Sequence, residues 1–146
     1  MVADRILNVL EARSPKNLTG DHYKPAAVLM PIQERHEEIG IDPSHVRVLG
    51  RLDQVTAAYD FVVTPFVGVI PPSYEFRLNP AETDAVFSVP IANLLEPKCV
   101  TVADHLSSHG EPVYHFYCNG WDIWGATARI IVQFLDLVYG YQVKQI

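Results

Sequence analysis

The sequence has few cysteines, no long apolar run and a deficit of basic residues. Its two cysteines, Cys99 and Cys118, form no C-x-x-C pair, so neither a zinc ribbon nor a redox dithiol is indicated. We expect both to be reduced, partly buried thiols. No run approaches the roughly 18 apolar residues of a membrane span, and the first residues lack the apolar segment of a secretory signal. These absences predict a soluble, cytoplasmic protein without a membrane partner.

Basic residues are outnumbered by acidic ones, 11 against 17, which gives a net charge of -6. Nucleic-acid binding usually requires a clustered excess of Lys and Arg, so nucleic acid is not an expected partner. The six histidines show no H-E-x-x-H spacing, and the sequence contains neither a G-x-S-x-G elbow nor a phosphate-cradling glycine loop. A zinc hydrolase is therefore not indicated.

The length and composition predict one globular domain over residues 1–146. The chain has 146 residues, of which 49% are hydrophobic, enough for one core and too few residues for two comfortable domains. Helical periodicity predicts a leading helix from Ala3 to Arg13 and an amphipathic helix from Ile123 to about Tyr139. In the second helix, Ile130, Ile131 and Phe134 are expected to form a buried stripe against a sheet.

Short β-favouring runs lie between these helices. We predict strands in the ranges 25–32, 46–55, 61–70, 86–91 and 113–118. The first is a continuous apolar run, which indicates a buried strand that Pro31 limits. Residues 33–40 favour a helix that Gly40 ends. This alternation predicts an α/β fold, with α/β/α layering around a mixed β-sheet.

Three carboxylates, Glu34, Glu37 and Glu38, are spaced at i, i+3 and i+4. On a helix they project from one face. A solvated acidic face is one interpretation of this pattern. The other is a divalent cation site, because hard oxygen donors suit Mg²⁺ or Mn²⁺ and a bound cation offsets the repulsion between the carboxylates.

The residues after this trio favour the metal site. The stretch Glu37-Glu38-Ile39-Gly40-Ile41 matches the closing E-E-x-G-U of the Nudix box, where U is a bulky aliphatic residue, and Glu34 falls at the Glu of the box's R-E pair. The chain thus resembles the Nudix superfamily of metal-dependent pyrophosphohydrolases. The resemblance implies that Glu34 and Glu38 ligate the metal, and that Glu37 and Glu34 are catalytic, with Glu37 a further ligand or a water-orienting carboxylate. The implied chemistry is metal-assisted attack of water on phosphorus.

Other segments resemble one branch of that superfamily, the coenzyme A diphosphatases. They are the entry run Lys24–Leu29, the stretches Thr64–Gly68 and Leu78–Glu82, and the I-W-G-A-T-A-R-I at Ile123–Ile130. The resemblance covers most of the chain. It implies a nucleoside diphosphate derivative as the substrate, with coenzyme A or a related dinucleotide as the leading candidate.

The chain departs from the family pattern between Ile32 and Gln33. The family has a hairpin, a glycine-rich turn and the Gly and first Glu of the box at this point, and none of them is present. Gln33 also replaces the box arginine, and Arg35 stands where an aliphatic residue is expected. Either the given chain lacks an internal segment or it is a shortened, inactive relative. Loss of strands would leave unpaired backbone groups at a sheet edge, which favours the first explanation.

Two functions from different classes follow. The chain is either a Mg²⁺- or Mn²⁺-dependent diphosphatase or a non-catalytic Nudix-fold module that binds a nucleotide or a protein, and a homodimer is compatible with both. Glu82, in a proline-flanked loop, is a candidate additional carboxylate, although a surface role is the simpler interpretation. Arg129 is expected to have a structural role, and His36 and His115 are interpreted as a surface residue and a hydrogen-bonded sheet residue.

Overall fold

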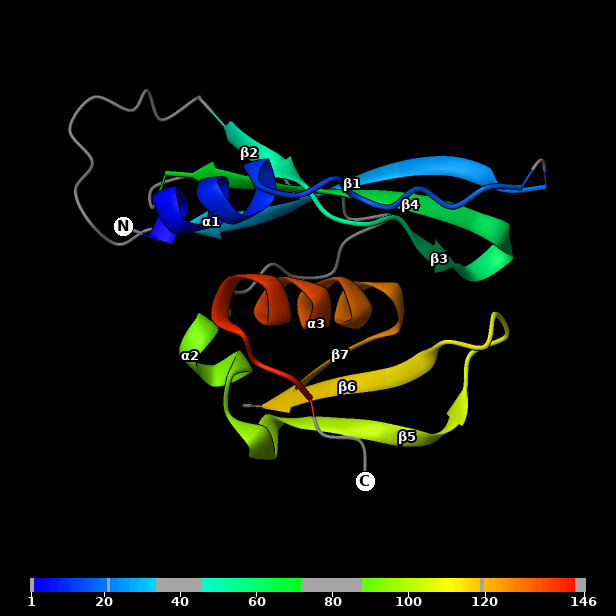
Figure 1. The fold of residues 1–146 in the computed structure, drawn as a ribbon. Coiled ribbons are helices and arrows are strands. Elements are labelled where there is room, and N and C mark those ends of the chain that lie inside the picture. The colour runs from blue at the N-terminus through cyan, green and yellow to red at the C-terminus, as the bar shows by residue number, and fades with distance from the viewer. Residues whose placement is uncertain (1, 21, 34–45, 72–87, 119, 144–146) are drawn as a thin grey trace, which may run out of the picture.

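A computed structural model shows two β-sheets with one helix between them (Figure 1), and it describes residues 2–20, 22–33, 46–71, 88–118 and 120–143. One sheet has four strands. In it β1, β4 and β2 are neighbours in that order, and β3 also pairs with β4. Their bounds are β1 Lys24–Gln33, β2 Arg47–Arg51, β3 Val55–Ala57 and β4 Phe61–Ile70. The second sheet has the order β5-β6-β7, with bounds Val100–Leu106, Pro112–Cys118 and Trp121–Trp124.

The longest helix, α3 (Gly125–Tyr139), lies between the two sheets, and α1 (Val2–Glu11) lies against the four-stranded sheet. The short helix α2 (Ile91–Leu94) and the 3-10 turns Ala58–Asp60 and Pro97–Cys99 are connections. The first sheet is mixed, because β1 runs parallel to β4 whereas β2 and β3 run antiparallel to it. The expected α/β fold with a mixed sheet is therefore confirmed.

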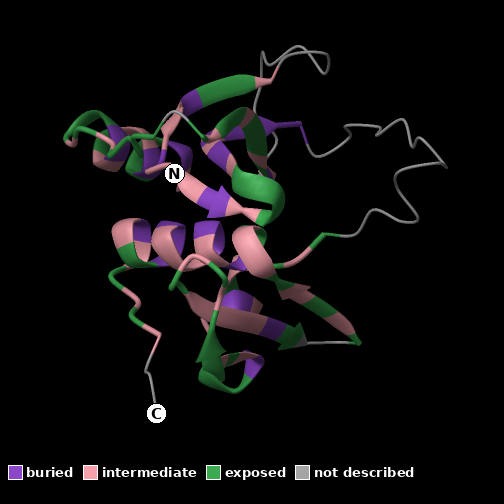
Figure 2. Cartoon of the chain, turned by 90° about the vertical axis from the view of Figure 1, so that its right-hand side faces the viewer, coloured by how far each residue is buried: buried purple, intermediate pink, exposed green. Residues whose placement is uncertain are grey.

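One apolar core fills the space around α3 (Figure 2). The predicted stripe is confirmed, since Ile130, Ile131 and Phe134 are all buried. α3 ends where expected, at Tyr139, and the next residue, Gly140, adopts a left-handed φ of 64° and donates its N–H to Asp136 O. α1 joins the same core through residues one turn apart, Ala3, Ile6 and Leu10.

A glycine allows α1 to pack closely on β2. A Cβ placed on Gly50 would lie 2.9 Å from the Cβ of Leu10, closer than real Cβ atoms approach other side chains. The register of β2 against β4 also shifts between Val48 and Gly50. The single strand predicted for residues 46–55 is accordingly two strands, β2 and β3, which both pair with β4.

β1 differs from its prediction in two respects. It was expected to be buried, yet most of its residues are exposed, because in the described part of the chain it lies at the edge of the sheet with β4 on one side only. It was also expected to be limited by Pro31, yet it continues to Gln33. The pairs Pro31 with Gly68, Ile32 with Val69 and Gln33 with Ile70 continue the register without interruption.

The second sheet was only partly predicted. β6 closely matches the predicted strand, whereas β5 was not predicted, and β7 occupies Ile123 and Trp124, which were assigned to the start of the helix. In the range 86–91, residues 88–90 form no strand and Ile91 begins α2, while residues 86 and 87 lie outside the described residues. β7 consists of only four residues, too few for alternation to distinguish it from the adjoining helix.

The expectation of reduced thiols is wrong for Cys99, which is buried and disulfide-bonded. Val100 pairs with Phe116, so the start of β5 lies beside the end of β6, where the second cysteine occurs. Strand pairing of this kind is invisible in the spacing of the two cysteines along the sequence. The side chain of Cys118 lies outside the described part of the structure.

Candidate functional site

The carboxylates singled out in the sequence, Glu34, Glu37, Glu38 and Glu82, lie outside the described residues, as does His36. Glu34, His36, Glu37 and Glu38 belong to residues 34–45, and Glu82 belongs to residues 72–87. The structure describes Gln33, directly before the first segment, and Pro71 and Ser88, on either side of the second. The structure therefore describes the residues that flank the candidate site in the sequence.

The side-chain amide of Gln33 makes hydrogen bonds with both residues that flank the second segment, Pro71 and Ser88. Its Nε2 donates to Pro71 O at 3.4 Å, and its Oε1 accepts from Ser88 Oγ at 3.3 Å. Its backbone is paired with Ile70, next to Pro71, because β1 and β4 run parallel and end together. The ends of β1 and β4 and the residue Ser88, which precedes α2, thus lie together at one corner of the four-stranded sheet.

The prediction that Gln33 opens a helix is wrong, because Gln33 is the last residue of β1. Helix propensity alone placed it with the following glutamates, but pairing with β4 overrides that preference. The consequence is that Glu34 directly follows a strand that is anchored along its whole length.

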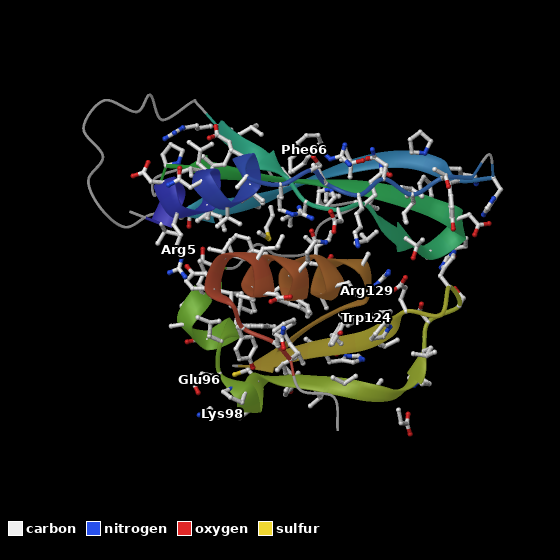
Figure 3. The ribbon with its side chains drawn as sticks, viewed as in Figure 1. Arg5, Phe66, Glu96, Lys98, Trp124 and Arg129 are labelled. Atoms are coloured by element: carbon white, nitrogen blue, oxygen red, sulfur yellow. The ribbon has the colours of Figure 1, made fainter. Side chains whose placement is uncertain are left out.

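Arg129 connects α3 to β3, as its predicted structural role requires. Its Nη1 donates to Thr56 Oγ1 at 3.2 Å, and its Nη2 donates to Thr56 O. Burial lowers the pKa of Arg129, and the nearby Glu111 carboxylate partly opposes that shift. Arg129 and the exposed Trp124 lie at the same end of α3 (Figure 3).

A second polar connection, centred on Asp53, was missed by the sequence analysis. Asp53 Oδ1 accepts from Arg13 Nη2 at 2.5 Å and from Lys16 N at 2.7 Å, and Asp53 N donates to Gln133 Oε1 at 2.7 Å. Partial burial by itself raises the pKa of Asp53, but the hydrogen bonds from Lys16 N–H and Arg13, with the positive charges of both residues, hold it below its ordinary value. The partners lie 40, 37 and 80 residues away along the chain, so no local motif could have indicated them.

His115 is a hydrogen-bonded sheet residue, as predicted. Its Nδ1 lies 3.0 Å from Asp122 Oδ1, and its ring stacks with Trp124 at a centroid distance of 6.1 Å. Within the described ranges, no group of three or more His, Cys, Asp or Glu side chains is arranged to hold a metal ion. No helix in the same residues is long and apolar enough to cross a membrane.

Comparison with known proteins shows the family. The chain is 35% identical over 120 residues to the uncharacterized Nudix hydrolase NudL of Photorhabdus laumondii, a match that covers 81% of this chain and 64% of the relative. It is 33% identical over 112 residues to the NudL of Escherichia coli K12, covering 76% of this chain and 58% of the relative. The chain belongs to the Nudix hydrolase superfamily.

The match also has limits. The chain spans about three fifths of the length of these relatives, 64% and 58% in the two cases. No protein-family model matches it.

Nudix enzymes typically use divalent metal ions, and the three glutamates at positions 34, 37 and 38 supply the hard oxygen donors that such ions prefer. No donor set of comparable chemistry exists among the described residues.

Proposed function

We propose that the chain belongs to a Mg²⁺- or Mn²⁺-dependent pyrophosphohydrolase that cleaves a nucleoside diphosphate derivative, with coenzyme A or a related dinucleotide as the leading substrate candidate, and that full activity requires the box segment that is absent after Ile32. The observation that carries the proposal is the sequence Glu37-Glu38-Ile39-Gly40-Ile41, preceded by Glu34, in a chain of the Nudix superfamily.

The three glutamates divide metal binding and water activation between them in this proposal. Glu34 and Glu38 hold the cation, which supplies charge neutralisation at the substrate diphosphate. Glu37, with Glu34, orients a water molecule and accepts its proton as the water oxygen bonds to phosphorus. The bond between that phosphorus and the bridging oxygen breaks, and the leaving phosphate takes the bond electrons. Glu82 remains a candidate further carboxylate.

A second function is favoured by one specific observation. The Gly and first Glu of the box are absent, and β1 runs through Ile32 and Gln33 without a break in register. A chain with this junction would have fewer fixed ligands around the metal, and loss of one preorganised group at a catalytic centre commonly costs about a hundredfold to a thousandfold in rate. The alternative is therefore a catalytically inactive Nudix-fold module that binds a nucleotide or a protein.

Metal binding can be tested without any substrate. We expect the chain to bind Mn²⁺ in titration calorimetry, and Glu38→Gln to weaken that binding because a neutral amide replaces a charged ligand. Glu96→Gln is the matched control, since Glu96 is an exposed glutamate remote in sequence from the trio. Equal Mn²⁺ binding by the parent chain and Glu38→Gln would show that the metal site has been misplaced.

Activity is tested with coenzyme A, by following release of 3′,5′-ADP and phosphopantetheine with and without metal. We expect the 146-residue chain to hydrolyse coenzyme A barely or not at all. A form with a family-like segment inserted after Ile32 is expected to be active with Mg²⁺ or Mn²⁺. Robust turnover by the short chain would contradict the interpretation of the junction. Inactivity of the extended form on every dinucleotide tried would leave only the binding module.

A further inference from the structure

The disulfide of Cys99 is a feature for which the proposed enzymatic function gives no role. Cys99 is buried and bonded in this way. A disulfide needs two cysteines, and the sequence contains one other, Cys118. Within a single chain Cys118 is therefore the partner. The bond joins the residue directly before β5 to the last residue of β6 and closes a loop that contains both strands.

β5 is weakly held apart from this bond. Within the described residues it pairs with β6 alone, at the edge of the second sheet (Figure 1). None of its residues is buried, and Leu106 at its end is 63% exposed. Its pairing with β6 is regular only from Val100 to Val102 and then shifts in register before Leu106. A short ladder without buried side chains contributes little to the retention of a strand.

β6, in contrast, is firmly held. It lies between β5 and β7 and pairs with both. Its Phe116 is 0% exposed and packs in the core around α3. Phe116 is also the residue opposite Val100, the first residue of β5. The disulfide thus fastens the start of an exposed strand to a fixed one, next to the pair at which their regular ladder begins.

We propose that the bond between Cys99 and Cys118 is a redox-controlled cross-link that keeps β5 on β6 and raises the stability of the chain when it is formed. Formation confines the loop in the unfolded chain and so lowers the conformational entropy of that state. In the folded chain the bond keeps Val100 beside Phe116, so β5 cannot fray from the regular end of its ladder. Both effects are lost when the bond is reduced.

The redox step is a thiol–disulfide exchange. A thiolate of a dithiol reductant attacks one sulfur of the bond, and the other cysteine leaves as a thiolate, which takes up a proton. The second thiol of the reductant then displaces the first cysteine and closes to a cyclic disulfide. Two electrons pass from the reductant to the chain, which gains two protons. Formation of the bond therefore depends on the reduction potential of the surroundings.

The connectivity is tested by alkylation and mass spectrometry of the full chain. Protein equilibrated with oxidised glutathione and then unfolded in urea with iodoacetamide should gain no alkyl group. Protein reduced beforehand should gain one at Cys99 and one at Cys118. Digestion without reductant should release the peptides of these cysteines as one cross-linked species. Alkylation of both cysteines in the oxidised sample, or glutathione attached to them in place of the cross-link, would overturn the proposal.

The thermal midpoint of unfolding tests the consequence. Reduction of the parent chain with dithiothreitol should lower it by roughly 5 to 10 °C, because a closed loop of about 20 residues is opened. Cys99→Ala and Cys118→Ala cannot form the bond, so the midpoint of each should not respond to the reductant. Each variant is compared with itself, with and without dithiothreitol, so the intrinsic cost of the substitution cancels.

Leu106→Ala is the matched control, because Leu106 is an exposed residue at the other end of β5, and this variant should keep the full response to dithiothreitol. An unchanged midpoint of the parent chain on reduction would refute the proposal. An equal response of the parent chain and the two cysteine variants would refute it as well. These measurements use neither metal nor substrate, so their outcome is independent of the proposed hydrolysis.

Discussion

β1 and β4 each have ten residues, pair with each other over their whole length, and differ sharply in burial. Both sequences are largely apolar, and both contain proline. β4 has neighbours on two sides and is buried along most of its length, whereas β1 has one neighbour among the strands that the structure describes and is mostly exposed. The comparison teaches that the environment of a strand in this fold depends on its position in the sheet more than on its own composition.

The prolines of the two strands also differ in their effect according to the position of the strand in the sheet. Pro65 lies in the central strand β4, where its C=O accepts from Leu52 N even though its missing N–H leaves a gap in the ladder. Pro31 lies in the edge strand and directs its nitrogen outward, so it removes nothing from the ladder.

The largest effect is expected where α3 covers the sheets. Phe134 is 2% exposed and packs in the core of which β4 forms part, so Phe134→Ala should lower the free energy of unfolding by about 3 to 5 kcal/mol. Urea unfolding monitored by circular dichroism measures this quantity. Leu106→Ala, at an exposed leucine of β5, is the control and should change little. A loss below about 1 kcal/mol for Phe134→Ala would show that α3 does not secure β4.

The next effect compares the paired strands directly. Val67 in β4 is 0% exposed and belongs to the core, so Val67→Ala should cost about 2 to 3 kcal/mol through lost burial and the cavity left behind. The free energy of unfolding is again the measured quantity. If Val67→Ala in β4 and Val28→Ala in β1 lowered the free energy of unfolding equally, the two strands would not differ in burial as described.

Asp53 tests the polar connections on the β2 and β3 side of β4. Asp53→Asn should cost about 1 kcal/mol near pH 7, because a charge-assisted hydrogen bond at a partly exposed site is lost. The pKa of Asp53 is lower in the folded chain than in the unfolded one. Its contribution is therefore present above the unfolded value of about 3.9 and is lost as the pH falls through the folded value.

The difference in unfolding free energy between the parent chain and Asp53→Asn should accordingly stay constant from about pH 7 to about pH 5 and shrink as the pH falls further below about 4. Asp104→Asn is the control, since the Asp104 side chain is fully exposed, and it should show no such trend. A difference for Asp53→Asn that grows toward acid would contradict the direction of the pKa shift.

The smallest effect is expected at the edge. Val28→Ala removes an exposed side chain and should change the free energy of unfolding by no more than about 0.5 kcal/mol. The measurement uses dilute protein, so that self-association does not contribute. A cost as large as that expected for Val67→Ala would mean that another part of the chain covers Val28.

The sequence by itself determined the elements whose signals are local. α1, β4, β6 and the C-terminal end of α3 follow from periodicity and β-favouring runs, and they were predicted close to their observed bounds. The Nudix superfamily also followed from sequence, because the spacing of Glu34, Glu37, Glu38 and Gly40 is itself the signal. The roles of these glutamates stay predictions, since they lie outside the described residues.

Only the tertiary structure decided which strands are central and which lie at an edge. β1 and β4 have similar local sequences, and their difference comes from pairing between residues 37 positions apart, such as Lys24 with Phe61. The same holds for Gln33, which is helix-favouring alone and a strand residue beside Ile70. It holds also for Asp53, whose charge is satisfied by Arg13. In each case the deciding contact joins distant segments, and its free energy exceeds the weak local preference that the sequence displays.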